Sequence, residues 1–411
     1  MESGELDNSG NGDRCRTIVE NSRWSKFCNG PSPSLARYAY GLIFFVTNIL
    51  AWAIRDYGHS ALSGLKRLKG CDGARECLGA EGVLRISLGC FVFFFVMCLS
   101  TAETKKLVEE RNMWHTKCWA WKIILWLGLM TIPFLVPSAL INLYGIIAHL
   151  GAGIFLVIQL ISVISFITWL NDCYRSEKNA ERCRVRVLVS SFAAYVSSFL
   201  GIILMYIWYA PKLSCEPNII FISLTLGLLQ IMTLVSIHPR VNAGFLAPGL
   251  MGVYLVFLCW CAVRSEPERD NRNRMAQTGT HKDWLTIISF VIAVLAIVMA
   301  TFSTGIDSRS FQFKKTEAEP DDVPYGYGFF HFVFAMGAMY FAMLFISWNA
   351  NQTTQRWTID VGWASTWVRV VNEWLAAVLY VWMLLASLAT RARESDATCR
   401  LENQSDPSDE G

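Results

Sequence analysis

Two ionisable side chains, Arg369 and Glu373, lie inside an apolar run near the carboxyl end of the chain. They are four residues apart, so on a helix they share one face and can form an ion pair. A charge near the middle of a membrane helix costs about 2.5–3.5 kcal/mol on insertion scales, so it is usually paired, extended to the surface or exposed to water. Arg369 can extend to a nearby membrane surface, whereas Glu373 reaches less far. We predict that Glu373 pairs with Arg369 or faces a wet cavity, with structural pairing favoured.

A second group of polar residues follows one side of the longest apolar segment. At about 100° per residue, six small or polar side chains fall within an arc of about 120°. They are Asn142, Gly145, His149, Ala152, Gly153 and Gln159. In one interpretation, which we favour, the small residues allow close helix packing and the polar ones hydrogen-bond across the contact. In the other, Asn142, His149 and Gln159 line a path for a lipid head group or a solute.

The sequence contains no familiar catalytic motif. The nearest approach to a phosphate-binding loop, Gly58 to Gly64, is followed by Leu65 where the lysine must stand, which disfavours an ATP-driven pump. His-Glu-x-x-His and Gly-x-Ser-x-Gly are also absent, and the six histidines are scattered along the chain. We therefore predict no catalytic residues, no cofactor and no metal site, in a protein that is not an enzyme.

The composition indicates the class of protein to which these residues belong. Of 411 residues, 53% are hydrophobic and 17% are charged, and the mean hydropathy is +0.35. Soluble proteins carry roughly a quarter of charged residues, so this composition indicates a membrane protein. The 36 basic and 33 acidic residues nearly balance and form no long basic block, so nucleic acid is not an expected partner.

A membrane-spanning helix needs roughly 20 mostly apolar residues, because its backbone groups can hydrogen-bond only within the helix. The sequence has ten such runs. They are 36–54, 83–102, 118–136, 138–170, 185–209, 219–237, 245–263, 284–302, 328–348 and 366–390. We predict an all-α polytopic protein with a mostly disordered polar tail over 1–35, a ten-helix domain over 36–390 and a second polar tail over 391–411.

The fourth run is unusually long. Pro133 and Pro137 end the preceding helix, and no proline follows from Ser138 to Tyr174. A helix over these residues is about 55 Å long, against a hydrocarbon core of roughly 30 Å. It must therefore tilt steeply or project from the membrane.

The basic residues indicate the orientation of the chain. If both tails and the loops after spans 2, 4, 6 and 8 lie on one side, that side holds 22 of the 36 basic residues. Basic residues favour the cytosolic side, so we predict cytosolic termini. Cys71 and Cys77 then lie on the opposite, oxidising side, where they form a disulfide or remain free thiols. Asn351 begins a glycosylation sequon on the same side.

Short sequence motifs within and between the predicted spans show a family resemblance. The residues that support it occur in order along nearly the whole chain. They are 76–79 with 83–91, 111–115, 132–137, 153–159, 238–242, 264–267, 327–332 and 366–369 before Trp374. The chain resembles the serine incorporator family of ten-pass eukaryotic membrane proteins. It departs from animal members by Ser165-Phe-Ile at the end of span 4, by lacking Cys-Asn-Pro after Pro267, and by adding Glu373, and it looks more like a plant-type member.

The resemblance implies two lobes of helices around a long tilted fourth helix, and involvement with membrane lipids. The leading hypothesis is energy-independent scrambling of phospholipids between leaflets. The alternative is a serine-binding auxiliary that works with enzymes of serine-lipid synthesis to place serine in phosphatidylserine and sphingolipids. A third hypothesis is a membrane scaffold without transport. Under each of these hypotheses, we expect the protein in the endomembrane system, the plasma membrane or both. The sequence does not predict its oligomeric state.

Overall fold

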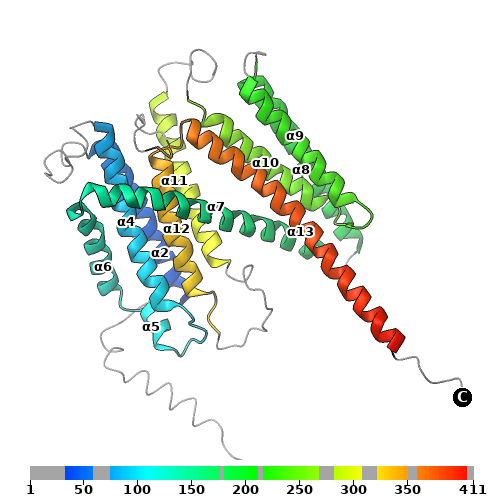
Figure 1. Cartoon of the computed structure of the whole chain (residues 1–411), viewed down its shortest axis with the longest axis horizontal. Coiled ribbons are helices and arrows are strands. Elements are labelled where there is room, and N and C mark those ends of the chain that lie inside the picture. The colour runs from blue at the N-terminus through cyan, green and yellow to red at the C-terminus, as the bar shows by residue number, and fades with distance from the viewer. Residues whose placement is uncertain are drawn as a thin grey trace, which may run out of the picture. The chain divides into compact units, whose positions relative to one another are not determined.

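The computed structural model describes residues 33–58, 75–175, 180–211, 216–267, 282–307, 322–349 and 359–404, which are almost entirely helical (Figure 1). The helices in chain order are α2 (Pro33–Tyr57), α4 (Arg75–Thr101), α5 (Glu110–Thr116), α6 (Trp119–Thr131), the 3-10 turn η2 (Ile132–Leu135), α7 (Ser138–Arg175), α8 (Ala180–Tyr209), α9 (Glu216–Ile237), α10 (Leu246–Arg264), α11 (Lys282–Ile306), α12 (Tyr327–Phe345) and α13 (Trp363–Gln404). The all-α prediction is confirmed.

Eight helices are long and apolar enough to cross a membrane, namely α2, α4, α7, α8, α9, α10, α12 and α13. A ninth span is present if α5 and the segment Trp119–Leu135 count together, although they meet at a bend of 66°. In α11 the apolar helix Phe290–Ile306 is shorter than a span requires. The described residues thus contain eight or nine candidate spans, and ten remains a prediction.

The third predicted span, 118–136, is not one regular helix. Cys118 separates α5 from α6 with a φ of 61°, a left-handed conformation that interrupts helical hydrogen bonding. Cys118 is also disulfide-bonded, a state that the sequence analysis did not single out. At the other end, Pro133 has no N–H to donate, and the chain passes into the 3-10 turn η2.

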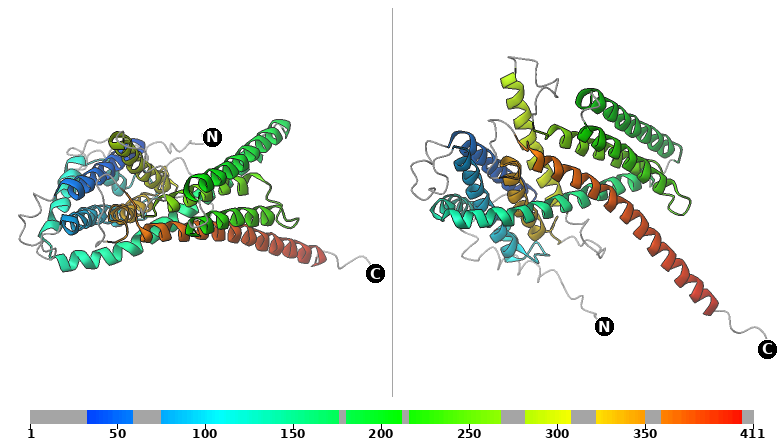
Figure 2. Two further views of the ribbon diagram at one scale, coloured as in Figure 1. Left: turned by 90° about the horizontal axis from the view of Figure 1, so that it is seen from above. Right: turned by 45° about the horizontal axis from the view of Figure 1, so that its top comes forward.

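The prediction for the fourth span is confirmed in its length. α7 begins at Ser138, directly after Pro137, and continues for 38 residues to Arg175. Figure 2 shows the course of this helix. At about 1.5 Å per residue it is about 57 Å long. By contrast, α13 continues to Gln404, so part of the predicted carboxyl-terminal tail is helical.

The chain divides into two compact units, and α7 contributes to both. Unit 1 comprises residues 1–159 and 283–360, and unit 2 comprises residues 160–282 and 361–411. The resemblance implies two lobes around α7, and that arrangement remains a prediction.

Unit 1 is built around the contact of α4 with α12, which is the most extensive helix pair in the chain. Tilted and edge-on aromatic rings fill this core: Phe94 of α4 and Phe44 of α2 each lie 5.1 Å from Phe334 of α12 between ring centroids. α7 joins the same core through Gly151, where a Cβ atom would overlap the sulfur of Met339. Close packing of large rings and small residues holds this unit together.

Unit 2 is organised around α10, which packs on α8, α9 and α13. Interhelical hydrogen bonds join α8 to α9, between the hydroxyls of Tyr195 and Thr233 at 2.9 Å, between those of Tyr206 and Ser223 at 2.7 Å, and from the Asn218 amide to the Tyr209 carbonyl at 3.0 Å. Such bonds stabilise helix association where no water competes for the polar groups.

Candidate lipid-handling surface and buried polar groups

The polar stripe of α7 lies along the border between the buried and the exposed face of this helix. Gly145 and Ala152 are buried, and a Cβ atom at Gly145 would meet Leu84 of α4 at 3.4 Å. Asn142 and His149 are exposed, whereas Gln159 is half-buried. Within unit 1 the stripe therefore has a packing edge of small residues and an outer edge of polar residues.

The outer edge is surrounded by large apolar side chains that face away from the protein. On α7, Leu143 is 53% exposed, Ile146 is 70% exposed and Leu150 is 68% exposed. In a membrane-spanning helix, such a surface contacts lipid acyl chains. His149 and Asn142 consequently place polar groups within a lipid-facing surface.

His149 has carbonyl oxygens beside both ring nitrogens. Its Nδ1 lies 2.7 Å from the Gly145 carbonyl oxygen, and its Nε2 lies 3.3 Å from the Trp348 carbonyl oxygen. A carbonyl oxygen only accepts hydrogen bonds, so the ring donates an N–H to a backbone carbonyl. His149 thereby keeps a polar ring on the outer edge of the stripe.

The Trp348 carbonyl is held in place by a tight turn after α12. Ser347 and Trp348 have φ values of 53° and 60°, which non-glycine residues rarely adopt. The Trp348 indole N–H donates to Asp360 at 3.2 Å, and the Trp348 backbone N–H donates to Met343 at 2.8 Å. These contacts fix the hydrogen-bonding partner of His149.

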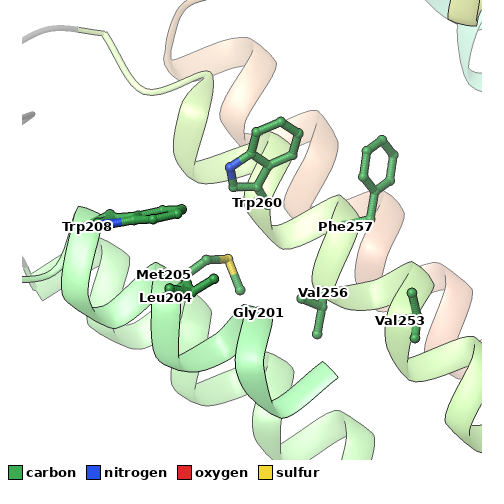
Figure 3. Close-up of a pocket in the computed structure, with 8 residues that line it drawn as sticks. All are labelled: Gly201, Leu204, Met205, Trp208, Val253, Val256, Phe257 and Trp260. Atoms are coloured by element: carbon green, nitrogen blue, oxygen red, sulfur yellow. The ribbon is translucent and has the colours of Figure 1, made fainter. Parts of the chain in front are cut away.

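An apolar groove lies between α8 and α10 in unit 2 (Figure 3). It has a volume of about 280 Å³ and is lined by Gly201, Leu204, Met205, Trp208, Val253, Val256, Phe257 and Trp260. A Cβ atom at Gly201 would lie 2.7 Å from Val256, so glycine permits the close approach of the two helices. The groove suits hydrocarbon, but its lining offers no charged group to a lipid head group.

Glu373 of α13 has a partner different from the one predicted. It is 2% exposed, and its Oε1 atom lies 2.7 Å from the Thr225 hydroxyl of α9. Among the described side chains, no Lys or Arg lies within salt-bridge distance of Glu373. The predicted pair with Arg369 is therefore replaced by a contact between helices, because Thr225 is the polar group that packing brings to the carboxyl.

A buried ion pair that the sequence analysis missed lies in α4. Arg85 is fully buried and contacts Glu81 at 2.5 Å, and the pair has the same four-residue spacing as Arg369 and Glu373. Arg85 also donates to the Pro133 carbonyl and, at 2.7 Å, to the Val136 carbonyl. It thereby ties α4 to the turn that precedes α7. The four-residue spacing in the sequence indicates such a pair. It was passed over because both residues lie near the predicted start of the span.

A second missed group joins two histidines that are 216 residues apart. His115 Nδ1 lies 3.0 Å from His331 Nε2, and His115 Nε2 lies 3.0 Å from the Tyr325 hydroxyl. Burial raises the pKa of Tyr325, so this hydroxyl keeps its proton. The tautomers of the two rings decide which atom donates in each contact, and the buried Nδ1 of His331 has no hydrogen-bond partner within the part of the chain that the structure describes.

Lys122 lies beside this histidine pair and is fully buried. Its ammonium donates to the His115 and Lys117 carbonyls at 2.8 and 2.7 Å and lies 4.5 Å from the Trp119 ring centroid. Carbonyl oxygens and an aromatic face compensate for the lost water. The ammonium therefore fixes the joint between α5 and α6.

The remaining predicted sites lie outside the described part of the chain. Cys71 and Asn351 belong to segments that the structure does not describe, as does the side chain of Cys77. Among the described residues, no group of three or more His, Cys, Asp or Glu side chains is arranged to hold a metal ion.

Comparison with known proteins gives matches along most of the chain. A family model described as serine incorporator (Serinc) matches residues 15–319 and 304–393. Bovine serine incorporator 3 is 24% identical over 443 residues, which cover 89% of this chain and 93% of that protein. A probable serine incorporator of Dictyostelium discoideum is 27% identical over 345 residues, covering 77% and 82% of the two chains. Rat serine incorporator 5 is 23% identical over 384 residues, covering 80% and 84%.

Proposed function

The chain belongs to the serine incorporator family and is a multi-pass integral membrane protein, and from this premise we propose that it scrambles phospholipids between the two leaflets without an energy source. In this function a head group follows polar side chains across the membrane while the acyl chains remain in lipid. The barrier to unassisted exchange is the transfer of a polar head group into hydrocarbon, which a line of polar groups lowers.

The observation that supports this proposal most strongly is the exposed outer edge of the α7 stripe. His149 and Asn142 stand among exposed apolar residues, so a lipid head group can reach them without the acyl chains leaving the bilayer. A ring N–H of His149 can donate a hydrogen bond to a phosphate oxygen. Gln159, half-buried further along the same stripe, extends the polar line.

Passive exchange is also consistent with the sequence motifs. The chain has no phosphate-binding loop of the Gly-x4-Gly-Lys-Ser/Thr type that would couple movement to ATP. A scramblase needs no such coupling, because it only lets lipids approach equilibrium between leaflets.

The alternative function is a serine-binding auxiliary of serine-lipid synthesis, which the names of the related proteins suggest. Serine carries an ammonium and a carboxylate, so a compact pocket for it needs an anionic and a cationic side chain close together. Glu373 supplies a carboxyl, but the described basic side chains lie beyond salt-bridge distance of it. We therefore favour scrambling.

The test uses purified protein in phospholipid vesicles that contain a small fraction of fluorescent phospholipid. An impermeant quencher is added outside, with no nucleotide present. Empty vesicles protect about half of the probe, because half of it lies in the inner leaflet. Wild-type protein should expose most of the protected half to the quencher.

The variants His149→Leu and Asn142→Leu should slow this exchange by at least several-fold while the protein remains folded, because each replaces a polar group by one that lipid tolerates. Thr168→Leu is the matched control, since Thr168 is an exposed polar residue of α7 outside the stripe. Wild-type vesicles that retain half of the fluorescence would overturn the proposal. Specific binding of labelled serine by the same preparation would then favour the auxiliary function.

A further inference from the structure

We propose that Glu373 is a proton-binding site inside the membrane, whose carboxyl group carries a proton in the folded protein at neutral pH. The proton lies between Glu373 and Thr225 and links α13 to α9. This proposal concerns unit 2 and is independent of the lipid path along α7.

The surroundings of Glu373 disfavour a negative charge. The residue lies near the middle of the candidate span Trp363–Ala386 and is 2% exposed. One turn before it, Val370 belongs to a buried apolar cluster with residues of α8, α9 and α10, and one turn after it, Ala376 and Ala377 belong to a second such cluster. An isolated carboxylate between two apolar clusters loses its hydration without compensation, whereas a neutral carboxyl needs only hydrogen-bond partners.

Among the residues that the structure describes, the neighbouring helices bring no counter-charge within salt-bridge distance of this carboxyl. α13 packs on α9 and α10. α9 presents the neutral Thr225 to Glu373, and α10 presents Cys259, a fully buried free thiol. On α13 itself, Arg369 is half-buried one turn away, beyond salt-bridge distance of Glu373. The charge balance therefore favours the protonated form.

The hydrogen atoms at Thr225 point to the same conclusion. The Thr225 hydroxyl lies 2.9 Å from the Phe221 carbonyl oxygen of its own helix and 2.7 Å from Glu373 Oε1. A hydroxyl has one hydrogen, and a carbonyl oxygen has none to give. If Thr225 donates to Phe221, as helical threonines commonly do, the shorter contact needs a hydrogen from Glu373. A protonated carboxyl supplies it, and both contacts of the Thr225 hydroxyl then have one hydrogen each.

A proton fits this site better than a metal cation. Sodium or potassium ions need several oxygen ligands, whereas Thr225 is the one hydrogen-bond partner that Glu373 has among the described side chains. A proton requires only the single acceptor that is present.

The test is infrared difference spectroscopy on the full chain in lipid, combined with thermal unfolding. We expect wild-type protein at neutral pH to show the C=O stretch of a protonated carboxylic acid, which shifts in D2O and is absent from Glu373→Gln. The matched control is Glu81→Gln, which changes the other buried glutamate and should retain the band. Glu373→Gln should unfold at nearly the wild-type temperature, because glutamine resembles the neutral acid. Glu81→Gln should unfold at a lower temperature, because it leaves Arg85 without its counter-charge.

The pH dependence gives a second readout with a definite sign. Because the folded protein holds the proton, raising the pH should remove the band and lower the unfolding temperature of wild type relative to Glu373→Gln. Thr225→Val should keep the band and shift it to higher frequency, since the carboxyl loses its acceptor. A wild-type spectrum without the band at neutral pH would overturn the proposal, as would loss of the band on adding sodium at constant ionic strength.

Discussion

Replacing Arg85 by Met should destabilise unit 1 by at least about 3–5 kcal/mol. The guanidinium is fully buried, and its removal leaves the carboxylate of Glu81, itself 5% exposed, without a counter-charge. Breaking a buried pair by removing one partner costs about 3–5 kcal/mol. The Val136 carbonyl also loses its donor, which costs about 1–3 kcal/mol of stability. The Pro133 carbonyl keeps another donor, because the Val136 N–H lies 3.2 Å from it.

A double-mutant cycle separates the pair from the rest of this network. Glu81→Gln alone should cost less than Arg85→Met, because Arg85 keeps both carbonyl acceptors and gains a neutral one. The double variant Glu81→Gln/Arg85→Met removes both charges. Its loss of unfolding free energy should be smaller than the sum of the losses in the two single variants. We expect a coupling of about 1–3 kcal/mol, in the range measured for residues in one polar network.

The measurement is reversible unfolding in mixed micelles with increasing dodecyl sulfate, followed by tryptophan fluorescence. Arg111→Met is the matched control, since Arg111 is exposed and should change stability by no more than about 0.5 kcal/mol. If the two single effects simply add, or if Arg85→Met is as stable as the control, the buried pair does not hold α4 to the turn before α7.

Two further predictions follow from packing and from the histidine pair. Gly151→Ala should be less stable than Gly153→Ala by about 1–3 kcal/mol, because a Cβ atom at Gly151 overlaps Met339 whereas none at Gly153 meets an atom within 4 Å. Comparing the two in the same unfolding assay cancels helix propensity, and equal stabilities would show that Met339 moves aside freely. Tyr325→Phe should cost about 1–3 kcal/mol by leaving the buried Nε2 of His115 without its hydrogen-bond partner. An unchanged unfolding midpoint would mean that water replaces the lost hydroxyl.

The sequence predicted the helices well wherever one local property decides them. The run of 138–170 without proline predicted a single long helix, and α7 has that form. The run 118–136 corresponds to α6 and η2, but the bend that joins this segment to α5 was not predicted, because neither hydropathy nor spacing reports the left-handed φ of Cys118. Backbone conformation at a joint depends on contacts such as those of Lys122, which the local sequence does not contain.

The candidate sites also combine features that the local sequence predicts with features that only helix packing decides. The stripe on α7 was readable because helical geometry alone places its residues on one side. Its division into a packing edge and an exposed edge was not readable, because that depends on which neighbour covers Gly145 and Ala152. The same holds for His115 and His331, whose two motifs gave no sign that the rings meet.

The sequence by itself determined the class of the protein, most of its membrane helices, the length of α7 and the family to which it belongs. These follow from apolar run length, proline positions and local motifs, all of which act over a few residues. Only the tertiary structure decided the partners of the buried polar groups: Thr225 rather than Arg369 for Glu373, two turn carbonyls for Arg85, and His331 for His115. A buried polar group must take its partner from whichever helix packs against it, and that choice is made by the fold of the whole unit.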